Sequence, residues 1–243
     1  GREMLATDSH DLYNIGDYAG YQMAVTNSSD IYSFGTFSLK QAIFTNSSKI
    51  TAIGYEAGMS SISAGSSRNF DYGDATGKLA VKTNSFFLYN FGTSAGGSQK
   101  QVDSFSVYNF GSLTGFEMIA TNSHDIYNSG DTSGHIMAVT NSSDLFNFGN
   151  QAGDGMFALD SHDIYNYGDH AGDGMRITNS SDIFAYGHNA LMNAALTNSS
   201  EVYAFGNAAG TNLIGSYTNI GIFQFGNFAV VPASGYSGAG TNF

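Results

Sequence analysis

One glycine recurs every nineteen residues along this chain, and each has a serine seven positions before it. Eleven coils follow this pattern without an insertion or a deletion, and a twelfth, ending at Gly226, is one residue longer. The glycines are Gly16, Gly35, Gly54, Gly73, Gly92, Gly111, Gly130, Gly149, Gly168, Gly187 and Gly206, and the serines run from Ser9 to Ser199. A period that tolerates no length change predicts repeats that stack in register, as in a solenoid.

The consensus coil reads T-N-S-S-D-I-Y-N-F-G-N-x-A-G-x-x-M-A-V. Its I-Y-N-F and M-A-V-T stretches are rich in residues that strands favour, and the Asn-Ser and Gly-Asn-x-x-Gly stretches between them are typical of turns. The sequence therefore predicts an all-β fold, a single β-solenoid of about twelve 19-residue coils with two short parallel strands per coil. We expect a lead-in at residues 1–5, the solenoid at 6–230 and a Gly/Ser-rich tail at 231–243.

Stacking places each repeat position in one column. The aliphatic column is the expected core: Leu12, Ile31, Ile50, Leu88, Val107, Ile126, Leu145, Ile164, Ile183, Val202 and Ile222, interrupted by Asn69. Two residues further on, hence on the same face of the strand, stand Asn14, Asn90, Asn109, Asn128, Asn147 and Asn166, with Ser33, Ala52, Asp71, Ala185, Ala204 and Gln224 in the other coils. We expect an internal amide ladder, because stacked carboxamides satisfy one another's hydrogen bonds.

The opposite face of the same strand carries aromatic residues in two columns, and Asp residues precede them at the same parity. The simplest assignment points the rings outward, where a second molecule covers them. The alternative is a strand that bends at its Asp and turns the rings inward. For the outward case we expect lateral self-contact through Tyr127, Phe146, Tyr165, Phe184 and Tyr203.

An acidic column occupies five consecutive coils at Asp125, Asp144, Asp163, Asp182 and Glu201. Stacking would hold these carboxylates about 5 Å apart, where like charges repel. Raised pKa values, a basic partner or bound cations would relieve the repulsion, and oxygen-only ligands suit Ca²⁺ best. We expect either a calcium site or a solvated edge with diffuse counterions, and no other cofactor.

Charge and motifs exclude several function classes. A net charge of −12 argues against nucleic acid as a partner, and no apolar run is long enough to predict a membrane span. Ser123-His124-Asp125 and Ser161-His162-Asp163 spell triads in sequence, but neighbours on an extended chain point to opposite faces. The sequence predicts no catalytic residue and no enzyme.

The coil resembles the repeat of the curlins, the subunits of bacterial curli fibres, whose pattern is S-x5-Q-x-G-x-G-N-x-A-x3-Q. Ser142 leads to Gly149-Asn150-x-Ala152, and Gly206-Asn207-x-Ala209 and Gly226-Asn227-x-Ala229 end similarly. Asn takes the place of the first Gln, as at Asn147, and the second glycine of G-x-G is missing. The resemblance implies an extracellular, amyloid-like structural fibre of a biofilm matrix.

Three functions from different classes are open at this point. The first is an extracellular structural protein of a cell surface or matrix that stacks head to tail on itself into a curli-like filament, favoured because neither end shows a recognisable cap. The second is an ice-binding β-solenoid, suggested by a threonine column that Ala64, Val102 and Leu159 interrupt. The third is a carbohydrate-binding solenoid adhesin, suggested by outward aromatics and carboxylates, although no two acids face each other across a cleft as glycan hydrolysis requires.

Overall fold

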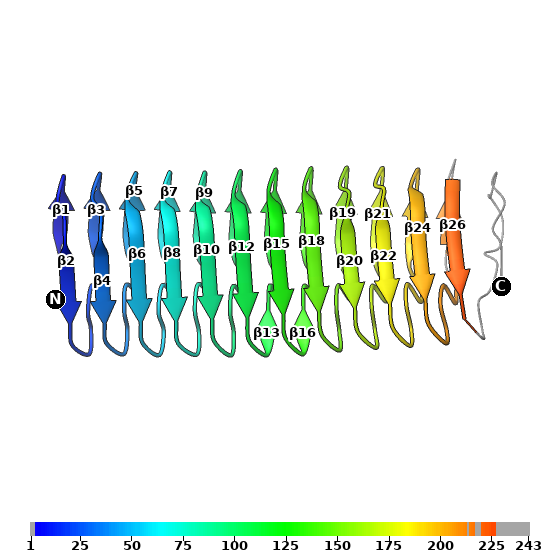
Figure 1. The fold of residues 1–243 in the computed structure, drawn as a ribbon, viewed down its shortest axis with the longest axis horizontal. Coiled ribbons are helices and arrows are strands. Elements are labelled where there is room, and N and C mark those ends of the chain that lie inside the picture. Colours follow the sequence, from blue (N-terminus) through cyan, green and yellow to red (C-terminus); the bar gives the residue numbers. More distant parts are fainter. Residues whose placement is uncertain (1–2, 213, 217–219, 227–243) are drawn as a thin grey trace. The chain divides into compact units, whose positions relative to one another are not determined.

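The structure is a computed structural model that describes residues 3–212, 214–216 and 220–226. The chain divides into two units, Gly1–Ile119 and Ala120–Phe243, and the division falls within strand β14 (Ile119–Thr121). The described residues form strands and turns, with no helix among them and so none that could cross a membrane. The predicted fold class, an all-β parallel solenoid with two strands per coil, is confirmed (Figure 1).

In unit 1, every coil contributes a short strand and a longer one, and each kind forms its own parallel sheet in chain order. The short strands are β1 (Leu5–Thr7), β3 (Ala24–Thr26), β5 (Ile43–Thr45), β7 (Ile62–Ala64), β9 (Val81–Thr83) and β11 (Lys100–Val102). The longer strands are β2 (Leu12–Ile15), β4 (Ile31–Phe34), β6 (Ser48–Ile53), β8 (Ser67–Tyr72), β10 (Phe86–Phe91) and β12 (Phe105–Phe110). A two-residue strand, β13 (Leu113–Thr114), lies in the turn that follows β12.

Unit 2 repeats the same arrangement. Its short strands are β17 (Ala138–Thr140), β19 (Phe157–Leu159), β21 (Arg176–Thr178), β23 (Ala195–Thr197) and β25 (Ile214–Ser216). Its longer strands are β15 (His124–Ser129), β18 (Ser143–Phe148), β20 (Ile164–Tyr167), β22 (Ile183–Tyr186), β24 (Ser200–Phe205) and β26 (Ile220–Phe225), and β16 (Thr132–Ser133) lies in a turn. The register follows the sequence period, because Leu145 pairs with Ile164 and Ile164 with Ile183, nineteen residues apart each time.

In each coil that the structure describes completely, four residues with a left-handed backbone turn the chain. In one coil of unit 2 they are Asp144 (φ 54°), Gly153 (φ 66°), Gly155 (φ 63°) and Asp160 (φ 48°). Gly, Asn and Asp adopt this conformation at the lowest cost. The Asn of the Thr-Asn-Ser corner and the Asp before the long strand therefore recur for a backbone reason.

The glycine that defines the period is required for a different reason. Its φ is not left-handed after the first coil, but a Cβ at Gly168 would lie 1.5 Å from the carbonyl oxygen of Gly149. The same holds in unit 1, where a Cβ at Gly73 would lie 1.5 Å from the Gly54 oxygen. Neighbouring coils approach so closely here that no side chain fits between them.

The predicted core and amide ladder are confirmed within each unit. The aliphatic column is buried from Ile31 to Val202. Five methionines are buried as well, each at the residue before a short strand, whereas the M-A-V-T stretch was expected to be strand throughout: Met23, Met118, Met137, Met156 and Met175. In unit 2 the Asn128 amide donates to the Asn147 oxygen at 2.9 Å, and Asn147 donates to Asn166 at 2.8 Å. In unit 1 Asn90 donates to Asn109 at 2.7 Å.

The serine column forms a second internal ladder. The Ser161 hydroxyl donates to the Leu159 carbonyl at 2.8 Å and accepts from the Ser142 backbone N–H at 3.3 Å. The buried Ser161 hydroxyl thus satisfies one corner carbonyl and one backbone amide of the coil before it, which avoids the cost of burying unpaired polar groups.

The domain boundaries stay a prediction. Residues 1–2 of the lead-in and the whole tail at 231–243 lie outside the described residues, as do Asn227 and Ala229 of the last curlin-like segment. The side chains of Ile222 and Gln224, expected in the twelfth coil, are also outside what is described.

Candidate interaction surface

Stacked aromatic rings form the most regular outward feature of unit 2. The first column is Tyr127, Phe146, Tyr165, Phe184 and Tyr203, whose successive ring centroids lie 4.7, 4.8, 5.0 and 4.6 Å apart with nearly parallel planes. This distance matches the spacing between paired strands. Each stacked pair contributes roughly 0.5–1.5 kcal/mol beyond the area it buries. The ladder therefore rigidifies the face on which it stands.

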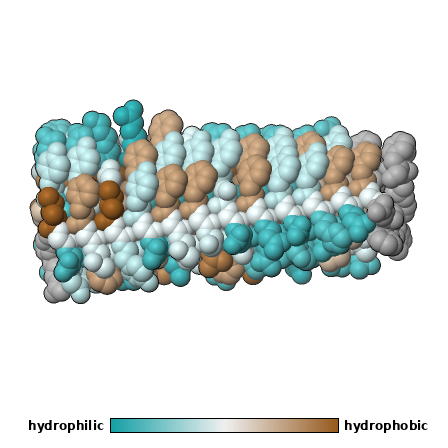
Figure 2. Space-filling view, turned by 60° about the horizontal axis from the view of Figure 1, so that its bottom comes forward, coloured by the Kyte–Doolittle hydropathy of each residue, from teal (hydrophilic) through white to brown (hydrophobic). Residues whose placement is uncertain are grey.

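A second column runs beside the first on the same strands. It consists of Phe148, Tyr167, Tyr186, Phe205 and Phe225, with successive centroids 5.1, 4.9, 4.5 and 4.7 Å apart. Phe148 is 42% exposed and Tyr167 is 37% exposed. We call the two columns together the unit 2 stripe. Figure 2 shows rows of brown and pale side chains on one face of the protein.

The rings point outward, so the inward alternative is wrong. Leu145 and Asn147 of β18 are buried, and strict alternation along the strand then directs Phe146 and Phe148 to the outside. The left-handed Asp144 turns the chain at the start of the strand without changing that alternation.

Unit 1 carries a less regular version of the same face. Phe70, Tyr89 and Tyr108 stack at 4.9 and 4.8 Å, and Tyr72, Phe91 and Phe110 stack at 4.9 and 5.1 Å. One coil earlier, Thr51 and Ile53 occupy the two positions, which ends the ring ladder.

The carboxylates of the acidic column flank the unit 2 stripe. Desolvation by burial, and then the negative charges of Asp125 and Asp144, raise the pKa of Tyr127. The same causes, in the same order, raise the pKa of Tyr165, where the charges include Asp163 and Asp182. These phenol hydroxyls therefore stay protonated and remain hydrogen-bond donors at neutral pH.

Local hydrogen bonds hold the acidic column. Asp144 accepts from the Ser143 hydroxyl at 3.0 Å, and Asp182 accepts from Ser181 at 2.9 Å. Nδ1 of His162 lies 2.9 Å from an Asp163 oxygen. A hydrogen bond with Asp182, followed by the repulsion of its charge, raises the pKa of Glu201. A raised pKa was one of the expected ways to relieve the crowding.

The calcium site at these five carboxylates stays a prediction. Within the part of the chain that the structure describes, no three His, Asp or Glu side chains gather closely enough to hold a metal ion. The left-handed backbone of this column, with φ of 54° at both Asp163 and Asp182, already accounts for aspartate at these positions.

The apparent triads do not assemble a nucleophile. His162 reaches Asp163, but the Ser161 hydroxyl is buried inside the coil, where it donates to the Leu159 carbonyl. In the catalytic triad of serine hydrolases, the serine hydroxyl is instead hydrogen-bonded to a ring nitrogen of the histidine. The sequence Ser-His-Asp is here a corner of the repeat.

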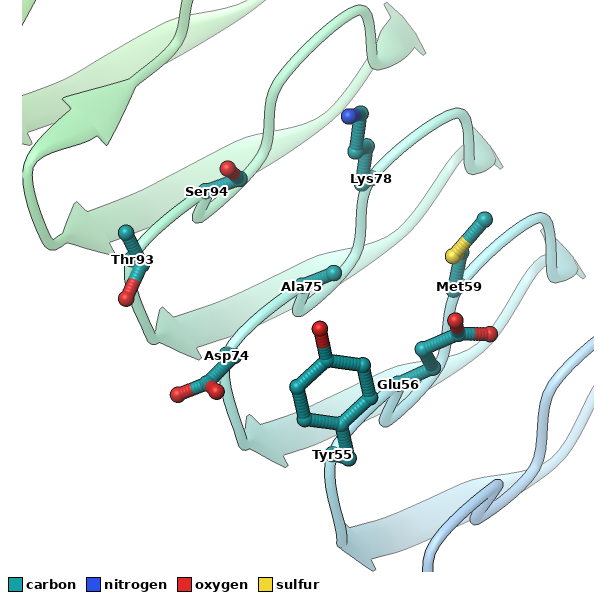
Figure 3. A pocket seen from close by; sticks show the side chains of 8 residues that line it. All are labelled: Tyr55, Glu56, Met59, Asp74, Ala75, Lys78, Thr93 and Ser94. Carbon is teal, nitrogen blue, oxygen red and sulfur yellow. The ribbon is translucent and has the colours of Figure 1, made fainter.

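Figure 3 shows the side chains that line a groove in unit 1, which is open to solvent. Its lining residues come from successive turns: Tyr55, Glu56, Met59, Asp74, Ala75, Lys78, Thr93 and Ser94. The Asp74 and Glu56 carboxylates point away from each other, on either side of the Tyr55 ring (Figure 3). The Glu56 carboxylate also forms an ion pair with the Lys40 amine. This arrangement does not place an acid and a base on one substrate atom.

Sequence reasoning did not single out the buried pair Asp71 and Lys82 in unit 1. The signal was present, because each charged residue interrupts an inward-facing column of the repeat. Lys82 lies at the position held by Val25 and Phe44 in earlier coils, and it is 2% exposed.

Comparisons with known proteins add little to this description. No family model matches the chain, and no curated protein matches it. Among solved structures, trypsin-treated QnrB1, described as a plasmid-mediated fluoroquinolone resistance protein, is similar over 82% of this chain and 83% of that chain, with 11% identity and a TM-score of 0.24. A similarity of that size supports no functional statement. The comparisons also give the curlin resemblance no support.

Proposed function

We propose that this chain is an extracellular structural protein that assembles with copies of itself into a filament, and that the unit 2 stripe is its lateral contact surface. The observation that carries the proposal is the outward ladder of ten stacked rings on unit 2. A continuous exposed apolar surface of this kind marks an interaction site in most proteins. The proposal assigns no catalytic role.

The size of the stripe supports a protein partner. An aromatic side chain has roughly 150–250 Å² of surface to bury, and these rings leave up to two fifths of their surface exposed. Ten such rings present on the order of several hundred Å², which approaches the roughly 800 Å² that each partner contributes to a standard interface.

Ring geometry favours protein packing over sugar binding. In a stack with planes within 2–4° of parallel, such as Tyr127, Phe146 and Tyr165, each ring face contacts the neighbouring ring. Only ring edges and tyrosine hydroxyls face outward. Sugar rings dock on open aromatic faces, so the adhesin alternative has less support. The threonine column, interrupted by Leu159 in unit 2, gives the ice-binding alternative no continuous flat ladder either.

The repeat itself supports growth along the coil direction. Within each unit the described coils are hydrogen-bonded in the same parallel register, as β18 is to β20 and β20 to β22. A coil edge of one copy can therefore pair with a coil edge of another copy. Such a contact is heterologous and does not close, so it propagates as a filament.

Charge sets the conditions for lateral contact. Asp125, Asp144, Asp163 and Asp182 flank the stripe, and the whole chain carries a net charge of −12. Two stripes approaching each other bring these carboxylates together, and salt screens that repulsion over a Debye length of about 8–10 Å. Lateral association should therefore strengthen as the salt concentration rises.

The experiment replaces Tyr127, Phe146, Tyr165, Phe184 and Tyr203 by Ser and compares filaments by negative-stain electron microscopy. We expect thin single filaments from the variant and laterally paired ones from the unchanged protein. A matched control replaces Phe70, Tyr89 and Tyr108 of unit 1 by Ser and should retain lateral pairing. Circular dichroism checks that each variant keeps its β structure.

A second variant separates the two contacts. Fusion of a bulky folded domain to either end should block elongation while leaving the stripe available. Normal elongation with the domain attached would contradict stacking, and unchanged lateral pairing in the five-ring variant would contradict the role of the stripe.

A further inference from the structure

The interior of unit 1 contains a polar cluster that the repeat does not require. Its members are Ser63 on β7, Asn69 and Asp71 on β8, and Lys82 on β9, all of them buried. Ser63 and Lys82 occupy one inward column of the short strands, and Asn69 interrupts the aliphatic column of the long strands. The cluster thus brings an amine and a carboxyl group together in the core.

Lys82 and Asp71 face each other at close range. Nζ of Lys82 lies 3.9 Å from Oδ2 of Asp71, and the two side chains are only 3% and 4% exposed. This distance exceeds that of a hydrogen bond, and Oδ2 of Asp71 has no hydrogen-bond partner among the described residues. The carboxyl group also packs against Gly58, where a Cβ would lie 2.5 Å from Cγ of Asp71.

A separated ion pair is costly at this depth. Burial raises the pKa of Asp71 to about 6, against an opposing effect of the Lys82 charge. Burial also lowers the pKa of Lys82, against the opposing effect of Asp71. Transfer of one proton from Nζ to Asp71 removes both charges and leaves a neutral amine next to a carboxylic acid.

Ser63 orients the amine. Nζ of Lys82 donates to the Ser63 hydroxyl at 3.5 Å, and the Asn69 amide donates to the same oxygen at 3.3 Å. An amine that directs a hydrogen to Ser63 can turn its lone pair toward the Asp71 carbonyl carbon. Reacting atoms in productive arrangements lie roughly 3–3.5 Å apart, so the condensation requires Nζ to approach the carboxyl group more closely than its present 3.9 Å from Oδ2.

We propose that Lys82 and Asp71 condense within the folded chain into an amide cross-link. The bond that forms joins Nζ of Lys82 to Cγ of Asp71, and the bond that breaks joins Cγ to the acid hydroxyl. That hydroxyl leaves as water with one of the two amine hydrogens, and the other hydrogen stays on the amide nitrogen. No oxidant, reductant or further reactant is needed.

The cross-link replaces two ionisable groups, which are costly to bury, by one neutral group. It replaces a buried acid and a buried amine by an amide, and it ties the long strand β8 to the short strand β9 that follows it in the chain. A covalent tie of this kind restricts the unfolded chain, as a disulfide does, in a protein that has no cysteine.

The test is the mass of the full chain, measured after denaturation. We expect the unchanged protein to be lighter than its sequence by one water molecule, and peptide mapping to find a branched peptide that joins the Lys82 and Asp71 segments. Lys82→Met should have the full sequence mass. Lys78→Met, which removes a solvent-accessible lysine four residues earlier, should keep the deficit.

Each remaining outcome overturns the proposal. A full sequence mass for the unchanged protein shows that no cross-link forms. A deficit that persists in Lys82→Met shows that another water loss, such as ring closure at Asp154-Gly155, is responsible. A deficit of one ammonia assigns the reaction to Asn69 instead of Asp71. The primary measurement uses the unchanged chain, so it does not depend on the folding of a variant.

Discussion

The two units share one backbone and differ in what they place inside it. Unit 2 begins its long-strand amide column with Asn128, Asn147 and Asn166, which are hydrogen-bonded in series, and continues it with the apolar Ala185 and Ala204. Unit 1 replaces the ladder in successive coils by Ser33, Ala52 and Asp71 before Asn90 resumes it. Buried side-chain atoms without a hydrogen-bond partner also concentrate in the described part of unit 1, at Ser61, Asn69, Asp71, Thr76, Gln99, Gln101 and Thr114.

This difference shows that the left-handed corners and the spacing between coils determine the fold, whatever side chains fill the interior. Both units keep the same left-handed corners and the same stacked glycine, although their interiors range from apolar to charged. Positions where a sequence departs from its own local rule without an evident structural gain are where function is expected. In unit 1 that position is the Lys82 and Asp71 pair, and in unit 2 it is the outward stripe.

The largest expected effect tests the shared backbone. Gly73→Ala and Gly168→Ala each place a Cβ 1.5 Å from a carbonyl oxygen of the preceding coil, so each should destabilise its unit by about 5 kcal/mol or more. Gly174→Ala is the control, since nothing lies within 4 Å of its Cβ and only its φ of 64° is strained, at about 1–2 kcal/mol. Urea unfolding measures all three. Tolerance of one glycine variant but not the other would break the equivalence of the two units.

The second-largest expected effect tests the amide ladder, whose disruption should cost different amounts of stability in the two units. Asn147→Ala leaves the Asn128 donor and the Asn166 acceptor buried without their partner and should cost about 4 kcal/mol. Asn90→Ala removes the bond to Asn109, so its expected cost is about 2 kcal/mol. Equal losses in urea unfolding would show that the ladder contributes no more than a single bond does.

The charge in the unit 1 core predicts a pH dependence that unit 2 lacks at this position. In Lys82→Met no cross-link can form and Asp71 titrates. Burial raises the pKa of Asp71 to about 6 even against the lowering effect of the Lys82 charge, so without Lys82 the folded pKa lies higher still above the ordinary value of 3.8. The stabilising contribution of the protonated acid is therefore full below pH 3.8 and is lost as the pH rises through the folded pKa. The loss is roughly 3 kcal/mol or more once the folded group is ionised. Unfolding at pH 4 and pH 7 measures it, with hydrogen exchange of β8 to locate the effect in unit 1.

The control for this pH dependence is the double variant Lys82→Met with Asp71→Asn. It carries no titrating group at position 71, so its stability should change less between the same two pH values. Parallel curves for the single and double variants would contradict the raised pKa, because they would show that Asp71 has the same pKa in the folded and the unfolded chain.

The smallest expected effect lies on the surface of unit 2. The hydrogen bond and charge of Asp182 raise the pKa of Glu201, so its favourable contribution exists below pH 4.5 and is lost as the pH rises through the higher folded value. Glu201→Gln should therefore raise Tm slightly at pH 7 and leave it unchanged at pH 4. Glu117→Gln in unit 1, where the carboxylate accepts from Ser98, is the matched control. A fall in Tm for Glu201→Gln at pH 7 would contradict the repulsion.

The sequence by itself determined what repeats. The nineteen-residue period fixed the parallel register, the two strands per coil and the columns, because residues one period apart must stack when no insertion intervenes. Alternation along β18 then sufficed to place Leu145 inside and Phe146 outside. The Asn-Ser stretch was likewise identified as a turn from its residue types alone.

Only the tertiary structure determined which side chains meet across the interior of the coil and how closely neighbouring backbones approach each other. The period relates positions nineteen apart, whereas Asp71 and Lys82 are eleven apart and meet because of the shape of the coil in cross-section. The stacked glycine was expected as a turn residue, but it is required because a carbonyl oxygen of the preceding coil lies where a Cβ would stand, and no local rule contains that contact. Contacts of this kind depend on the distances between backbone segments in the folded coil, and the period of the sequence does not encode those distances.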